Sequence, residues 1–167
     1  MKHDLETYLN DHLAGSAGGL ILAKKLAETA TDNAQKLFFH DLTDKIEEDR
    51  AILTTLIQQG GFSIGTIRHA VGSAMARASV WRMDMNGMDL GELGRFEMIE
   101  LLALGIHGKS LLWKTLREIN GTMPAWAAHD FGELERQAME QRASIEIYRA
   151  GEALQVFAKC TDQALSH

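Results

Sequence analysis

The chain has 167 residues, of which 46% are hydrophobic and 24% are charged, and its formal net charge is −6. This length and apolar content are sufficient for one domain, residues 1–167, with a core of its own, and they argue against a disordered chain. The negative charge argues against general nucleic-acid binding, which needs a basic surface to meet phosphates. A single proline predicts long helices, because strands and loops would use more.

Two features of the sequence bear on location. No stretch is apolar over the roughly 18 residues that a transmembrane helix needs. Asp4 and Glu6 stand where a signal peptide would need its apolar core. We therefore expect a cytoplasmic protein without a transmembrane segment.

Hydrophobic periodicity predicts a first long helix over residues 4–30, with Leu5, Leu9 and Leu20 on its apolar face. Capping residues at 31–33 predict a tight turn, so a second helix that follows them and ends near residue 59 should fold back antiparallel to the first. Two glycines at 60 and 61 should end that second helix.

A connection over residues 60–89 follows, and its apolar residues from 67 to 81 share one face, which predicts a shorter helix. The third long helix is expected over 89–119, with a seam that includes Leu93, Leu104, Leu111 and Thr115. Residues 120–124 break the pattern, and a fourth helix is expected over 127–164. Its inward-facing residues are expected to be Phe131, Leu134, Ala138, Ile145, Arg149 and Val156.

Two antiparallel pairs joined by one long crossover make an all-α, up-down-down-up four-helix bundle with a short extra helix in the crossover. The stretches YLNDHLAGSAGG (8–19), LTDKIEEDRAIL (42–53) and LLALGIHGKSLLWKTL (101–116) resemble those of small uncharacterised bacterial members of the ferritin-like superfamily. The resemblance implies a ferritin-like bundle over nearly the whole chain.

Di-iron members of this superfamily bind their metals with Glu-x-x-His pairs, whose spacing places carboxylate and imidazole on one helix face. No Glu-x-x-His occurs in this sequence: Glu47 is followed at that spacing by Arg50, and Glu97 by Glu100. We therefore expect no di-iron site and no ferroxidase or oxygenase chemistry.

A different polar set is expected inside the bundle. His12 lies on the first helix's apolar face and Asp49 on that of the second, and the antiparallel turn places them at one level, where they could pair. His107 of the third helix reaches a similar height. Three interpretations stay open: a buried His–Asp pair with His107 exposed, a small-ligand pocket, or a site for a divalent metal ion.

A second inward layer is expected from Glu97 and Glu100 on the third helix and Arg142 and Arg149 on the fourth. Buried carboxylates need partners, and bidentate arginine pairing supplies them. This layer is interpreted as a structural ion-pair network or, alternatively, as a set of groups that recognises a small polar ligand.

Glycines are concentrated in the first and third helices, at Gly15, Gly18 and Gly19 and at Gly91, Gly94, Gly105 and Gly108. Each weakens a helix relative to alanine, so the cluster predicts a close approach of the two backbones. The alternative is a small cavity beside His12.

These observations favour a non-catalytic bundle that acts through self-association, as a homo-oligomer joined through helix faces, or through partner binding. No cofactor is expected. The alternative is a metal- or small-ligand-binding module that uses the level of His12, Asp49 and His107.

Overall fold

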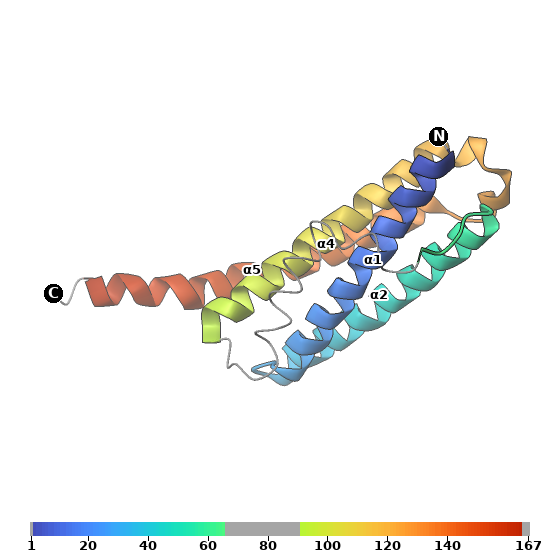
Figure 1. Cartoon of the computed structure of the whole chain (residues 1–167). Helices are drawn as coiled ribbons and strands as arrows, with labels where there is room; N and C mark the ends of the chain where they lie inside the picture. Colours follow the sequence, from blue (N-terminus) through green and yellow to red (C-terminus); the bar gives the residue numbers. More distant parts are fainter. Residues whose placement is uncertain (1, 66–90, 165–167) are drawn as a thin grey trace.

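The computed structural model describes residues 2–65 and 91–164, with side chains as far as residue 158. Four long helices make up this part of the chain (Figure 1): α1 (Lys2–Glu28), α2 (Asn33–Gln59), α4 (Gly91–Ile119) and α5 (Phe131–Ala164). Short 3-10 turns, η2 (Asn120–Thr122) and η3 (Pro124–Trp126), connect α4 to α5. The described residues contain no strand, so the all-α prediction is confirmed, while the predicted crossover helix over 67–81 lies outside them.

The predicted helix junctions are confirmed. The Asp32 side chain caps α2 by accepting a hydrogen bond of 2.8 Å from the backbone N–H of Gln35. Gly60 ends α2, and Gly61 follows with φ of +67°, a left-handed conformation that favours glycine. Turn chemistry therefore sets both ends of this helix.

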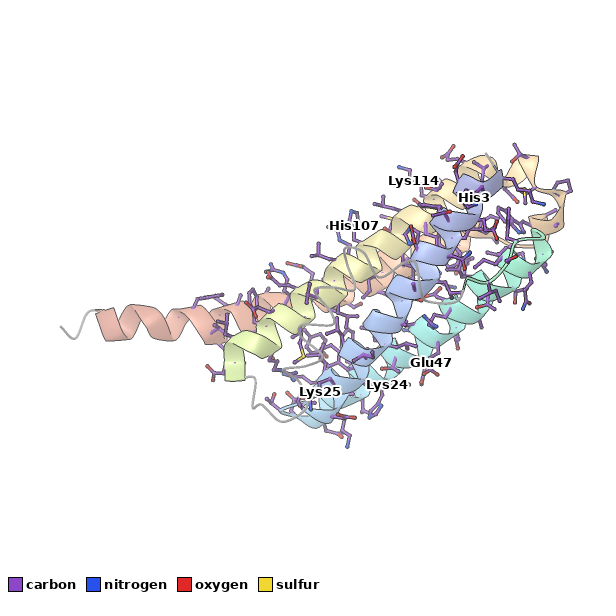
Figure 2. All side chains as sticks on the ribbon, in the orientation of Figure 1. His3, Lys24, Lys25, Glu47, His107 and Lys114 are labelled. Atoms are coloured by element: carbon purple, nitrogen blue, oxygen red, sulfur yellow. The ribbon has the colours of Figure 1, made fainter. Side chains whose placement is uncertain are left out.

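The contacts between helices define their relative directions. The short turn between α1 and α2 returns the chain alongside α1, and η2 and η3 return it alongside α4 (Figure 1). Helices α1 and α4 run antiparallel: Tyr8 donates to Thr115 at 3.3 Å near one end, and Arg95 donates to the carbonyl of Thr29 at 2.9 Å near the other. On the surface, Lys24 and Glu47 join α1 to α2 by an ion pair of 2.8 Å (Figure 2).

The core consists of two apolar clusters separated along the helices. One lies toward η3 and contains Leu9, Leu53, Leu56, Trp113, Trp126 and Phe131. The other lies toward the turn between α1 and α2 and contains Leu26, Phe39, Leu42, Ile99, Leu102 and Ile145. The middle of each helix, between these clusters, carries polar residues, and the middles of α1 and α4 also carry glycines.

The predicted inward seam of α4 is wrong. Leu93, Leu104 and Leu111 are 50%, 66% and 48% exposed among the described residues. The face that is buried instead contains Arg95, Met98, Ile99, Leu102, Ile106, Trp113 and Leu116. Because successive residues are about 100° apart on a helix, this shift of one to two positions turns α4 by more than 90° from the predicted orientation.

The predicted close approach of the glycines is also wrong. A Cβ built on Gly15, Gly18, Gly19, Gly105 or Gly108 would meet no heavy atom of the described residues within 4 Å, neighbouring chain atoms aside. For Gly105 and Gly108, the predicted contact with α1 is missing because of the rotation of α4, which turns the part of the helix that carries them away from α1. Within residues 2–65 and 91–164, these glycines are therefore not packed against another backbone.

None of the helices in residues 2–65 and 91–164 is both long and apolar enough to cross a membrane.

Candidate functional site

A layer of polar side chains lies between the two apolar clusters and contains Ser16, Asp49, Arg50, Lys109 and Gln141. Each of the four helices contributes to this polar layer. Arg50 ties α2 to α1 by donating a hydrogen bond of 2.8 Å to the carbonyl of Leu13 and another to the Ser16 hydroxyl. Charged groups of α2 and α4 therefore meet in this layer, inside the described part of the bundle.

Lys109 is the centre of the polar layer. Its ammonium donates to the Asp49 carboxylate on α2 and to the Gln141 side-chain oxygen on α5. The Lys109 and Asp49 side chains are only 13% and 12% exposed. An ammonium has three N–H donors, so two are engaged by the protein and the third points to no hydrogen-bond acceptor of the described residues.

A cleft between α2 and α5 leads to this ion pair. Its volume is about 470 Å³. Apolar and charged side chains both line it, among them Phe38, Leu42, Lys45, Asp49, Glu140 and Gln141. Asp49 and Gln141 therefore belong both to the polar layer and to the wall of a cleft large enough for a small molecule.

Burial shifts both charged groups toward their neutral forms. It raises the pKa of the Asp49 carboxyl, although the Lys109 ammonium partly opposes that rise. Burial lowers the pKa of Lys109, against the opposing effect of Asp49. A cleft that contains titratable groups shifted by burial and by a charged partner is a candidate binding or catalytic site.

The predicted pairing of His12 with Asp49 is not found in the structure. Asp49 is bonded to Lys109, while the His12 ring packs edge-on against Tyr8 with 4.7 Å between ring centroids. Residues 12 and 49 do lie in neighbouring stretches of α1 and α2, but Arg50 is the α2 side chain that reaches across to α1.

Burial of His12 predicts a pH effect on stability. Burial lowers the pKa of His12, and nearby Asp11 opposes the shift only partly. The unfolded chain therefore binds the proton more readily, so this contribution to stability is complete above pH 6.5 and is lost as pH falls through the lower folded-state pKa. We expect His12→Gln to show a shallower loss of unfolding free energy between pH 6.5 and 5 than the natural chain.

Urea unfolding at several pH values measures that slope. His3→Gln is the matched control, because His3 is exposed on the same helix (Figure 2). Equal slopes for His12→Gln and the natural chain would contradict a buried, pKa-lowered His12.

The predicted second polar layer is only partly present. Glu100 and Arg149 do meet, with 3.3 Å between Oε1 and Nη1, but Arg149 bonds more closely to Glu146 on its own helix, at 2.6 Å. Glu97 and Arg142 are exposed. The predicted burial of these two residues is wrong. The true orientation of α4 turns Glu97 toward solvent, and Arg142 follows the buried Gln141 on α5, about 100° further around that helix.

The buried ion pair near this end of the bundle is Arg95 with Glu152, which sequence reasoning missed. Their Nε and Oε1 atoms are 2.7 Å apart, and the side chains are 9% and 7% exposed. Arg95 also donates to the carbonyl of Thr29 at 2.9 Å and to the Gln35 side chain at 2.5 Å. One guanidinium thus joins all four long helices, through α4, α5, the end of α1 and the start of α2.

His107 does not join His12 and Asp49 in a metal-ligating group. Its Nδ1 atom is buried without a hydrogen-bond partner among the described residues. In the view of Figure 2 the side chain projects from the side of α4 that is away from α2. Across residues 2–65 and 91–164, no group of three or more histidine, cysteine, aspartate or glutamate side chains could hold a metal ion.

The sequence analysis did not identify five site and core residues: Arg50, Arg95, Lys109, Gln141 and Glu152. The available signal for two of them was spacing: Lys109 is 14 residues, about four helical turns, after Arg95, so both lie near one face of α4. The chain matches no protein-family model, no curated protein and no solved structure.

Proposed function

We propose that this protein is a non-catalytic, ferritin-like bundle of up-down-down-up order that acts in the cytoplasm through self-association or partner binding. The stretches 8–19, 42–53 and 101–116 support the ferritin-like assignment through their resemblance to members of that superfamily. The antiparallel contacts between α1 and α4 agree with that order.

The observation that carries the functional proposal is the number of large apolar side chains on the outside of α4 and α5. They include Leu93, Leu104, Leu111, Met139, Ile147 and Leu154. Contiguous exposed apolar surface on a folded protein is typical of an interaction site. Both helices carry a second apolar face in addition to the one that packs in the core.

The test is the state of the full chain in solution and in cells. Sedimentation velocity should give a mass above the 18.5 kDa of one chain, or a photo-crosslinker placed at Leu104 or Ile147 should give a defined adduct in cells. A chain that stays monomeric at every concentration and yields no adduct at either position would overturn the proposal.

Small-ligand binding is the second candidate function, and the cleft between α2 and α5 is the observation in its favour. Asp49 and Gln141, which both bond the Lys109 ammonium, line the cleft, and their oxygens could accept hydrogen bonds from a compound that carries N–H or O–H donors. Native mass spectrometry of the purified full chain should then show an added mass that is lost in Lys109→Met, which removes the cation bonded to both side chains. An unmodified mass, with no stabilisation by small amines, would count against this function.

We also propose that the bundle uses no metal cofactor. The support is chemical: the Asp49 carboxylate is bound to Lys109, and the ligand spacing of di-iron relatives is missing from the sequence. Near-stoichiometric iron, manganese or zinc in protein purified without added metal, and lost in His12→Ala, would contradict this expectation.

A further inference from the structure

Helix α5 is apolar on two opposite faces. Its inner face buries Phe131, Ala138 and Ile145 in the core. A second row of apolar residues follows the helix at intervals of three or four, which places them on one stripe about opposite the buried one. This outer α5 face consists of Met139, Ala143, Ile147, Ala150, Leu154 and Phe157.

The outer α5 face is long and exposed. Met139, Ile147 and Leu154 are 58%, 74% and 70% exposed. The stripe spans about five turns, or roughly 27 Å at 1.5 Å per residue. Its last member, Phe157, meets Phe96 edge-on at 5.4 Å, and from about there α5 extends past the other helices (Figure 1). A helix that is apolar on both sides is typical of one buried on both sides.

We propose that the outer α5 face binds the same face of a second copy of this chain, with the two α5 helices antiparallel and the two-fold axis beside Ile147. The proposal rests on the self-association part of the proposed function and names its surface. An isologous interface requires a patch that is complementary to itself.

The apolar residues meet that requirement. In an antiparallel pair, the numbers of two residues that face each other have a constant sum, which is about 295 here. Ile147 then faces Ile147 of the second copy. Ala143 then faces Ala150, and Met139 lies opposite Leu154 and Phe157. Alanines therefore pack against alanines on either side of the central isoleucine pair, and the larger side chains of Met139, Leu154 and Phe157 pack at both ends of the contact.

Helix dipoles favour the antiparallel direction, because the positive N-terminal end of each α5 then lies beside the negative C-terminal end of the other. The charged pair of Glu146 and Arg149 does not decide the direction. Arg149 is only about 40° around the helix from the buried Ile145, and it also bonds Glu100 of α4 at 3.3 Å.

Sedimentation velocity of the full chain tests the surface. Ile147→Glu should raise the dimer dissociation constant at least about 10-fold, because each copy would bring one glutamate to the two-fold axis and the two like charges would face each other. Leu104→Glu, at a similarly exposed leucine of α4, is the matched control and should leave the dimer intact. Both substitutions are at exposed positions, and circular dichroism should show unchanged helicity.

A cysteine crosslink tests the register. In a Cys160→Ser background, which removes the natural cysteine, oxidised Ile147→Cys should form a disulfide-linked species of twice the 18.5 kDa mass. Leu104→Cys should not.

Different results would contradict the α5 interface and the self-association of the chain. A dimer that survives Ile147→Glu, or that dissociates with Leu104→Glu and crosslinks at residue 104, would overturn the α5 interface while leaving self-association in place. A natural chain that is monomeric at every concentration would overturn the α5 dimer, and with no cellular adduct it would overturn the proposed function as well.

Discussion

Replacing Arg95 with methionine should lower the free energy of unfolding by about 3–5 kcal/mol, which is a large part of the ~5–15 kcal/mol typical of a domain. The substitution leaves Glu152 charged, buried and without its partner. It also removes the donors for the Thr29 carbonyl and the Gln35 side chain. Urea unfolding followed by circular dichroism measures the change.

Two variants control the interpretation of Arg95→Met. Arg136→Met removes an arginine of α5 that is 54% exposed and pairs with the exposed Glu133 and Glu140, and it should cost less than about 1 kcal/mol. The double variant Arg95→Met with Glu152→Met removes both charges and should regain most of the lost stability. A loss within about 1 kcal/mol for Arg95→Met alone would show that this pair does not hold the four helices together.

Replacing Lys109 with methionine should lower the free energy of unfolding at pH 7 by about 3 kcal/mol, since Asp49 is then left as a buried carboxylate without a cation. Loss of the ammonium removes the main group that opposes the burial-induced rise of the Asp49 pKa, so that pKa should rise further. A carboxyl whose pKa is raised in the folded state stabilises the protein at low pH and loses that contribution as pH rises through the folded-state pKa. The difference between Lys109→Met and the natural chain should therefore shrink on acidification from pH 7 to 5.

Lys45→Met is the matched control for this experiment. Lys45 lies on the wall of the same cleft, but its side chain is 47% exposed, and its ion pair with Asp41 is on the surface. It should change stability by less than about 1 kcal/mol, with no comparable dependence on pH. Equal effects of Lys45→Met and Lys109→Met would contradict a buried pair at the centre of the polar layer.

The helices and their junctions could be predicted because they depend on local chemistry. Asp32 caps α2 through its own side chain, and Gly61 permits the left-handed turn that follows it. The inward face of α5 was also predicted correctly at Phe131, Ala138 and Ile145. In each case the deciding residues lie within a few turns of the feature that they set.

The orientation of α4 could not be predicted in the same way, because that helix has two apolar stripes. Periodicity alone does not distinguish the stripe with Leu104 and Leu111 from the one with Leu102 and Trp113. Only the second packs in the core. Which stripe turns inward depends on packing against the other helices, and a single sequence does not contain that information.

The wrong orientation of α4 also made the prediction of the candidate site wrong. Asp49 was correctly expected to face inward, but its partner is on α4, so a misjudged rotation of α4 led to His12 in place of Lys109. Because of the same wrong orientation, Glu97 was predicted to be the buried charge of α4, whereas the structure buries Arg95 and exposes Glu97. Polar partners across a bundle are therefore the part of a site most sensitive to a small error in helix orientation.

The glycines of α1 have a consequence for its dynamics. Gly15, Gly18 and Gly19 lie within about one turn at the middle of the helix, and no contact with the described residues compensates for the missing side chains. Each weakens the helix by roughly 1 kcal/mol relative to alanine. Backbone amides there should exchange with deuterium through a local opening that needs less free energy than global unfolding. Helices ordinarily fray from their ends, but α1 should open first at its centre, beside the polar layer.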